Sequence, residues 1–180
     1  YTAGDVSVDK GANGPAVMKL FEVVPAWSGL SERAAREAGY AADSALLFSP
    51  DHATYYPGAK NMTLKVVFDR TDGRILGAQA VGFGGTEKRI DVLATAIRAG
   101  FTAEELTELD LCYAPPYSSA KDPVNMAGYV IGNILRGTAR QHTWKDAENP
   151  PDVENALFLD VQTRGEYDAA HLAGAINIPV

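Results

Sequence analysis

The stretch that decides the fold is Met62-Thr-Leu-Lys-Val-Val-Phe-Asp69, followed by Arg70-Thr-Asp-Gly73 and then by Ile75-Leu-Gly-Ala-Gln-Ala-Val81. In its first arm every second residue is apolar, as expected of a strand with one buried face. These alternating residues are Met62, Leu64, Val66 and Phe68. The dipeptide Asp72-Gly73 favours a tight turn, and the second arm returns at strand length. The stretch therefore predicts an antiparallel β-hairpin.

Shorter elements are predicted on the N-terminal side of this hairpin. Residues 16–24 have apolar side chains on both alternating faces, which predicts a central strand that ends at Pro25. Residues 31–38 predict a short helix closed by Gly39, because they are rich in Ala, Glu and Arg. Residues 45–48 form a short apolar run and predict another strand.

Three helices are predicted after the hairpin. The first has apolar residues at helical spacing, the second begins with the capping box of Thr102 and Glu105, and the third opens with Asp122-Pro123. Their expected ranges are 86–99, 102–108 and 122 to about 135. Strands followed by helices predict an α+β fold, an antiparallel sheet with helices packed on one face.

Composition excludes several classes of partner. The 180 residues include 16 basic and 23 acidic ones, so that a net charge of −7 argues against nucleic acid and anionic membranes. No apolar run reaches the length of a membrane span. Cys112 is the only cysteine, which excludes an internal disulfide and fits a cytoplasmic protein. The three histidines are too scattered for metal-ligand spacing, and no metal site is expected.

Two weak catalytic signals have simpler interpretations. The loop 82–87 joins a strand to a helix and could hold a phosphate, but Glu87 replaces the third glycine of a dinucleotide motif. A plain strand-to-helix turn is therefore favoured. Cys112 could be a nucleophile with His52 as its base, whereas a lone cysteine beside Leu111 is more often buried and inert.

Two proline-containing loops are unusually rich in tyrosine. Tyr55 and Tyr56 lie in the loop 52–58, and Tyr113 and Tyr117 lie in the loop 112–119. A tyrosine on a stiffened loop suits an interface or the edge of a ligand, because it joins an apolar ring to a hydroxyl. The alternative is that each ring only fastens its loop to the core. The residues alone leave both interpretations open.

Several long motifs, in order, resemble one family. They are Tyr55-Tyr-Pro-Gly-Ala-Lys60, Gly73-Arg-Ile-Leu-Gly-Ala-Gln79, Lys88-Arg-Ile-Asp-Val-Leu-Ala94 and Tyr113-Ala-Pro-Pro-Tyr-Ser-Ser-Ala-Lys-Asp-Pro-Val-Asn125. Together they are similar to the C-terminal dimerisation domain of pyridine nucleotide-disulfide oxidoreductases, in the coenzyme A-disulfide reductase and NADH oxidase branch. The resemblance places this domain at residues 16–137 and implies a homodimer.

The resemblance also implies a chemistry for the complete enzyme. FAD and NAD(P)H would bind in N-terminal domains, so this chain alone is expected to bind neither. The implied substrate is coenzyme A disulfide or a related thiol compound, with polysulfide and oxygen as the other possible acceptors. Carried over by motif position, Tyr55 and Tyr113 would be the catalytic hydroxyls, turned toward the partner subunit's redox cysteine. The implied substrate-binding residues are Tyr56, Tyr117, Lys60, Lys88 and Arg89.

The two ends of the chain resemble parts of other domains. Asp5 lies in a Gly-Asp motif like the one that contacts the flavin in the family, but its link to Gly11 is shorter than the family's, which predicts that residues 1–15 are a remnant. Residues 138–155 are polar and predict a linker. Residues 156–180 resemble the start of a rhodanese domain, with Gln162 where that family usually has arginine. The rhodanese sulfur-carrying cysteine would follow Val180, so no sulfurtransferase activity is expected.

Two hypotheses follow for the chain as a whole. In the first, it is the dimerisation and active-site-completing part of a flavin-dependent disulfide reductase. In the second, it is a free-standing dimerisation or binding module without redox activity.

Overall fold

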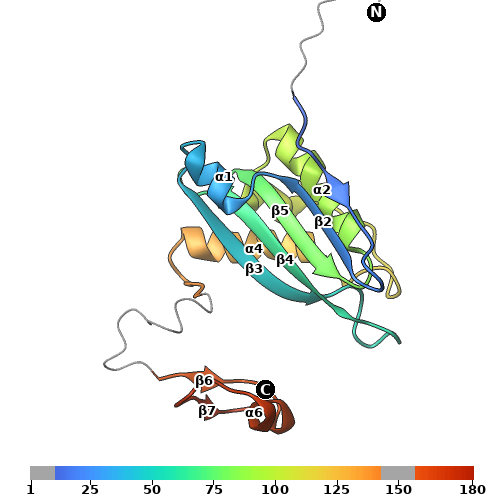
Figure 1. The fold of residues 1–180 in the computed structure, drawn as a ribbon, viewed down its shortest axis with the longest axis vertical. Helices are drawn as coiled ribbons and strands as arrows, with labels where there is room; N and C mark the ends of the chain where they lie inside the picture. The colour runs from blue at the N-terminus through green and yellow to red at the C-terminus, as the bar shows by residue number, and fades with distance from the viewer. Residues whose placement is uncertain (1–10, 143–156) are drawn as a thin grey trace, which may run out of the picture. The chain divides into compact units, whose positions relative to one another are not determined.

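A computed structural model describes residues 11–142 and 157–180, which fall into two compact units that meet in sequence at Gln141 and His142. Asp5 and most of the predicted linker lie outside the described residues. Each unit is considered by itself below, and Figure 1 shows both.

The larger unit is built on a five-stranded antiparallel sheet with the strand order β1-β2-β5-β4-β3. Its strands are β1 (Ala16–Val17), β2 (Val24–Gly29), β3 (Ala42–Pro50), β4 (Asn61–Asp69) and β5 (Ile75–Gly82). The predicted hairpin is confirmed as the β4–β5 pair, with Val66 opposite Ala78. This pair lies inside the sheet, which explains why both of its arms are largely buried.

Three helices cover one face of this sheet, and one short helix lies on the other (Figure 1). The first group is α2 (Thr86–Ala99), α3 (Ala103–Glu108) and α4 (Pro123–Leu135), and the short helix is α1 (Glu32–Glu37). The main core lies beneath the group of three and includes Leu64, Phe68, Leu93 and Ile131. Val67, which points the opposite way along β4, belongs to a small second cluster with Ala35 of α1. The α+β class is confirmed.

The helix ends follow the capping signals in the sequence. At the start of α3 the Glu105 carboxylate accepts a hydrogen bond of 2.7 Å from the Thr102 backbone N–H, which completes the capping box. At the start of α4 the Asp122 carboxylate accepts one of 3.0 Å from the N–H of Val124. The first cap fixes where α3 begins, and the second fixes where the loop between α3 and α4 ends.

The prediction of a central strand over residues 16–24 is wrong. This segment forms an edge hairpin whose tip, Phe21, is 95% exposed and has a left-handed φ of 55°. Pro25 does not end a strand but lies within β2, where its carbonyl accepts a 3.0 Å hydrogen bond from the N–H of Met18. Its missing N–H is tolerated beside the short edge strand. Apolar residues on both faces thus reflect an uncovered hairpin rather than a buried strand.

The smaller unit contains a strand, a helix and a second strand parallel to the first. They are β6 (Leu159–Asp160), α6 (Arg164–Ala169) and β7 (Ile176–Asn177). The Tyr167 hydroxyl donates a 2.8 Å hydrogen bond to the carbonyl of Ala175, and its ring stacks on His171 at 3.9 Å between centroids. The apolar side chain of Leu159 in β6 is 54% exposed, so nothing described covers it.

Candidate functional site

Two loops distant in sequence bring a pair of tyrosine hydroxyls together. Tyr55 lies in the connection between β3 and β4, and Tyr113 lies 58 positions later, between α3 and α4. Their hydroxyl oxygens are 2.7 Å apart and share a hydrogen bond. The loops are also joined through their backbones, because the N–H of Ala53 lies 3.2 Å from the carbonyls of both Pro115 and Ser118.

The tyrosine rings stand on the surface. Tyr55 is 74% exposed and Tyr117 is 72% exposed, while Tyr56 and Tyr113 are about half exposed. Rings that only fastened their loops to the core would be buried, so this interpretation is not supported. The loops instead present aromatic side chains outward, which is the arrangement expected at an interface or a ligand edge.

The hydrogen bond also changes the acid–base chemistry of the pair. The Tyr55 hydroxyl beside Tyr113 raises the pKa of Tyr113 above its ordinary value of 10.0, and a small loss of solvation acts in the same direction. Tyr113 therefore remains a neutral phenol over an even wider pH range than a free tyrosine. A neutral phenol can donate a hydrogen bond to an anion without adding charge to the site.

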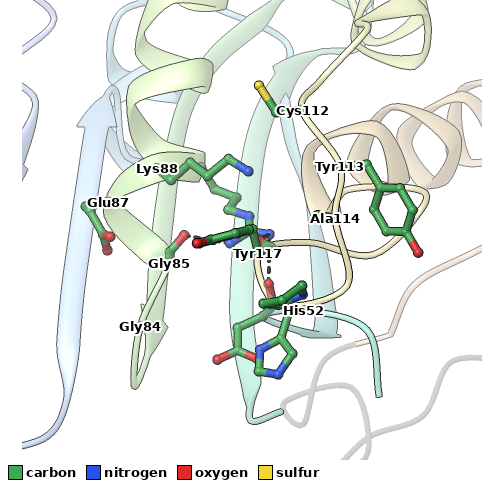
Figure 2. A pocket seen from close by; sticks show the side chains of 12 residues that line it. His52, Gly84, Gly85, Glu87, Lys88, Cys112, Tyr113, Ala114 and Tyr117 are labelled. Carbon is green, nitrogen blue, oxygen red and sulfur yellow. Dashed lines mark hydrogen bonds and ion pairs between the residues drawn. The ribbon is translucent and has the colours of Figure 1, made fainter. Parts of the chain in front are cut away.

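A pocket of about 560 Å³ lies beside the pair, lined by residues of both tyrosine loops and of α2. Figure 2 shows Lys88 directed into this pocket, with Cys112 and His52 at its opposite ends. Cys112 is exposed, which corrects the expectation that it is buried. The ring nitrogen Nδ1 of His52 lies 2.8 Å from an Asp51 carboxylate oxygen. Its other ring nitrogen, Nε2, lies 3.4 Å from the carbonyl oxygen of Pro57, so both ring nitrogens face protein oxygens and not the Cys112 thiol.

The loop 82–87 forms one wall of this pocket. Gly85, with a left-handed φ of 69°, precedes the first turn of α2, and no side chain caps this helix end. The Gly85 carbonyl accepts a hydrogen bond of 3.1 Å from Nη1 of Arg89, and the Thr86 hydroxyl donates one of 2.9 Å to the carbonyl of Val24. Both contacts fasten the loop at its helix end, which supports the interpretation as a strand-to-helix turn.

Arg89 was predicted to bind substrate, and the structure gives it a different place. Its side chain is 1% exposed, and all three guanidinium nitrogens are bonded to protein oxygens. Its main partner is the Asp122 carboxylate, 2.9 Å from Nη2. Because each guanidinium nitrogen already donates to a protein oxygen, this side chain is held by the protein rather than left open for a ligand, although it forms part of the pocket wall. Its neighbour Lys88 is only half-buried in the pocket, and the Lys60 ammonium lies 4.6 Å from the centre of the Phe83 ring.

Sequence inspection missed the polar groups beneath the loops. Asp122 was recognised only as a helix cap, and neither Asp51 nor Ser118 was identified. No local pattern marks them, since they meet Arg89 from segments 29 to 38 positions away. Within the described ranges, no helix has the length and apolarity to cross a membrane, and no cluster of three His, Cys, Asp or Glu side chains could hold a metal.

Residues 16–123 match the family described as "Pyridine nucleotide-disulphide oxidoreductase, dimerisation domain". The chain belongs to this family. The match includes the whole sheet, helices α2 and α3, and both tyrosine loops of the dimerisation domain.

Three individual proteins show which members of this family the chain is similar to. The coenzyme A disulfide reductase of Staphylococcus haemolyticus is 43% identical over 120 residues, which make up 67% of this chain and 27% of that protein. The structure of reduced Bacillus anthracis CoADR-RHD covers 96% of the chain, with 41% identity and a TM-score of 0.86. That of a NAD-dependent persulfide reductase from A. fulgidus covers 98%, with 38% identity and a TM-score of 0.84. The chain spans 31% of each of these two, which is less than a third of their length.

Proposed function

We propose that this chain is the dimerisation and active-site-completing part of an FAD-dependent NAD(P)H:disulfide oxidoreductase that resembles coenzyme A disulfide reductase. Membership of the dimerisation family and the likeness to named coenzyme A disulfide and persulfide reductases support the class. The proposed substrate is coenzyme A disulfide or a related thiol compound.

The observation that carries this proposal is the exposed hydroxyl pair of Tyr55 and Tyr113. Two phenols hold two protons, and only one of them is used in the hydrogen bond between the rings. The other is free to point outward, where it can be donated to an incoming anion. Cleavage of a disulfide by electrons releases a thiolate, and a neutral donor aimed at that sulfur stabilises the charge as it develops.

The acceptor of this proton is proposed to lie in the partner subunit of a homodimer. Tyr55 is 74% exposed on its own subunit, so the ring is available to enter another surface. The FAD would supply electrons drawn from NAD(P)H, and we assign it to the part of the longer relatives that this chain does not match. The neutral phenol of Tyr113 suits a developing thiolate, because it donates a hydrogen bond without adding charge. Asp5 is proposed only as a remnant of the flavin contact.

The test is subunit complementation in the complete homodimeric enzyme. One subunit carries Tyr113→Phe, and the other lacks the redox cysteine but keeps both tyrosines. If the tyrosines act across the interface, the mixed dimer contains one intact site and one doubly damaged site, and it regains disulfide turnover that neither parent dimer has.

Two results would contradict the proposal. A mixed dimer as inactive as its parents would place the tyrosines in their own subunit's site. A Tyr113→Phe homodimer with unchanged disulfide turnover would remove the hydroxyl from the reaction altogether. Flavin reduction by NAD(P)H serves as the internal control, because it should be equal in both tyrosine forms.

We further propose that residues 157–180 begin a rhodanese-like domain. The parallel β6–α6–β7 arrangement and the uncovered apolar side chains of both strands support a larger α/β layer. The full-length protein should then transfer sulfur from thiosulfate to cyanide, and it should lose only this activity when shortened before Leu157. A full-length protein without sulfur transfer would contradict this part of the proposal.

A further inference from the structure

Arg89 joins the segments that carry the tyrosine pair, although it touches neither hydroxyl. It lies in the first turn of α2, and its Nε donates to both Asp122 carboxylate oxygens at 3.3 and 3.2 Å. Its Nη1 donates to the carbonyl of Gly85. Its Nη2 lies 2.9 Å from the Asp51 carbonyl, 3.3 Å from the Ser118 hydroxyl and 3.4 Å from the Tyr117 carbonyl.

These acceptors lie at the base of both loops. Asp51 precedes Tyr55 by four positions at the end of β3, and Ser118 follows Tyr113 by five positions. Ser118 is itself fixed, because its hydroxyl donates a 2.7 Å hydrogen bond to Asp122. One side chain thus ties together the bases of two loops, which are also joined directly by the N–H of Ala53 and the carbonyls of Pro115 and Ser118.

We infer that Arg89 is a positioning residue, which holds the two loops at the separation that lets the Tyr55 and Tyr113 hydroxyls meet. The inference rests on the proposed function, in which that pair donates to the partner's site. Only a planar group with donors on several sides can bond a carboxylate and carbonyls from three loops together. A lysine ammonium keeps the charge opposite Asp122 but presents its three protons from a single point.

The experiment replaces Arg89 in the full-length enzyme by lysine. The lysine variant keeps the buried charge balanced, which favours folding. Ser118→Ala is the second, milder variant, since it removes one oxygen that bridges Arg89 and Asp122 and leaves the ion pair in place. Arg33→Lys in the exposed part of α1 is the matched control, because it makes the same exchange far from the loops.

Two readouts separate positioning from general damage. In Arg89→Lys the rate of disulfide reduction should fall by between about tenfold and 100-fold, as expected for a small displacement of reacting groups, while flavin reduction by NAD(P)H is unchanged. In NMR spectra of labelled tyrosine, the Tyr113 pKa should move down toward its ordinary value as the hydroxyl pair separates. Ser118→Ala should move both quantities in the same direction but less, and Arg33→Lys should move neither.

A double-variant comparison distinguishes failure of this inference from failure of the proposed function. If Arg89 acts through the tyrosines, Arg89→Lys should slow the Tyr113→Phe enzyme far less than it slows the wild type. Equal slowing in both backgrounds, or an unmoved Tyr113 titration in folded Arg89→Lys and Ser118→Ala, would overturn the inference. A Tyr113→Phe enzyme with full activity would overturn the proposed function instead, whatever the NMR titration shows.

Discussion

The side chains of Arg89 and Asp122 form an ion pair of 2.9 Å from which solvent is almost entirely excluded, with exposed fractions of 1% and 3%. Asp122 also caps α4 and accepts a hydrogen bond from Ser118. One carboxylate thus binds the first turn of a helix, a loop hydroxyl and a buried cation. Burial makes such a pair costly to break, because the group left behind keeps its charge without a partner.

Replacing Asp122 by asparagine should therefore destabilise the domain strongly. Asparagine can still cap α4, so that the main loss is the charge opposite Arg89. The free energy of unfolding should fall by about 3–5 kcal/mol, the range for a buried pair with one partner removed. Urea unfolding followed by circular dichroism measures this change.

The matched control is Asp43→Asn, which breaks the surface pair between Asp43 and Arg70. Those side chains are 31% and 53% exposed, so water screens the charges. The expected loss is below about 1 kcal/mol. Similar losses in the two variants would show that the burial of the Arg89 pair does not matter for stability.

Tyr55→Phe should lower the pKa of Tyr113. The Tyr55 hydroxyl is the main cause of the raised value, so its removal should return Tyr113 toward the ordinary value of about 10. Since the folded-state pKa is raised, the stability linked to this proton is complete below about pH 10 and is lost as the pH rises through the folded value. An NMR titration with labelled tyrosine measures the shift.

Tyr117→Phe provides the comparison for this titration. Tyr117 is an exposed tyrosine of the same loop, but the Tyr113 pKa owes nothing to it. Its replacement should leave the Tyr113 titration where it is in the wild type. A shift of equal size in both variants would mean that loop packing, and not the hydroxyl pair, sets the value.

Replacing either of two glycines of α4 by alanine should change the stability of the domain, but in opposite directions. A Cβ on Gly128 would lie 2.6 Å from the carbonyl oxygen of Ala103, so α3 and α4 would be forced apart at a cost of about 1–3 kcal/mol. A Cβ on Gly132 would meet only the end of the flexible Arg136 side chain, at 3.1 Å. Gly132→Ala should thus be neutral or stabilising by up to about 1 kcal/mol, through helix propensity.

Thermal unfolding of the two variants measures this difference in stability. Each variant is the control for the other, because both replace glycine by alanine and lie one helical turn apart. Equal effects would mean that α3 and α4 do not meet at Gly128. Gly128 and Gly132 lie four positions apart in the sequence, and their immediate neighbours do not tell them apart. Only the packing of α3 against α4 distinguishes them.

Local signals predicted the regular elements well, because those elements are determined by neighbouring residues. The β4–β5 hairpin and the start of α3 follow from alternation, turn chemistry and a capping box. The β1–β2 region failed because its apolar residues remain uncovered in the described chain, and apolar character alone does not reveal what covers a strand. β3 also begins before the predicted 45–48 run, since its polar first half pairs with β4.

The site was predictable only in part. The tyrosines carry a recognisable composition, but their meeting depends on loops brought together by the sheet and α2. The role of Arg89 could not be read from its neighbours in sequence, since all its partners except Gly85 come from two distant segments, Asp51 and residues 117–122. A cationic residue beside Lys88 looks like a ligand contact until its burial is known.

The edge of the sheet gives the last prediction. β3 is an edge strand, and the Gln141 side chain pairs with it as a further strand would, accepting from the N–H of Leu46 and donating to its carbonyl, both at 2.8 Å. Gln141→Ala removes the hydrogen-bond partner of both the N–H and the carbonyl of Leu46. One net hydrogen bond is worth about 1 kcal/mol, so hydrogen exchange of the Leu46 amide should speed up about fivefold. Gln141→Glu keeps the acceptor but turns a carboxylate toward the Leu46 carbonyl, so it should speed exchange as well. Unchanged exchange in both variants would show that this side chain does not protect the edge.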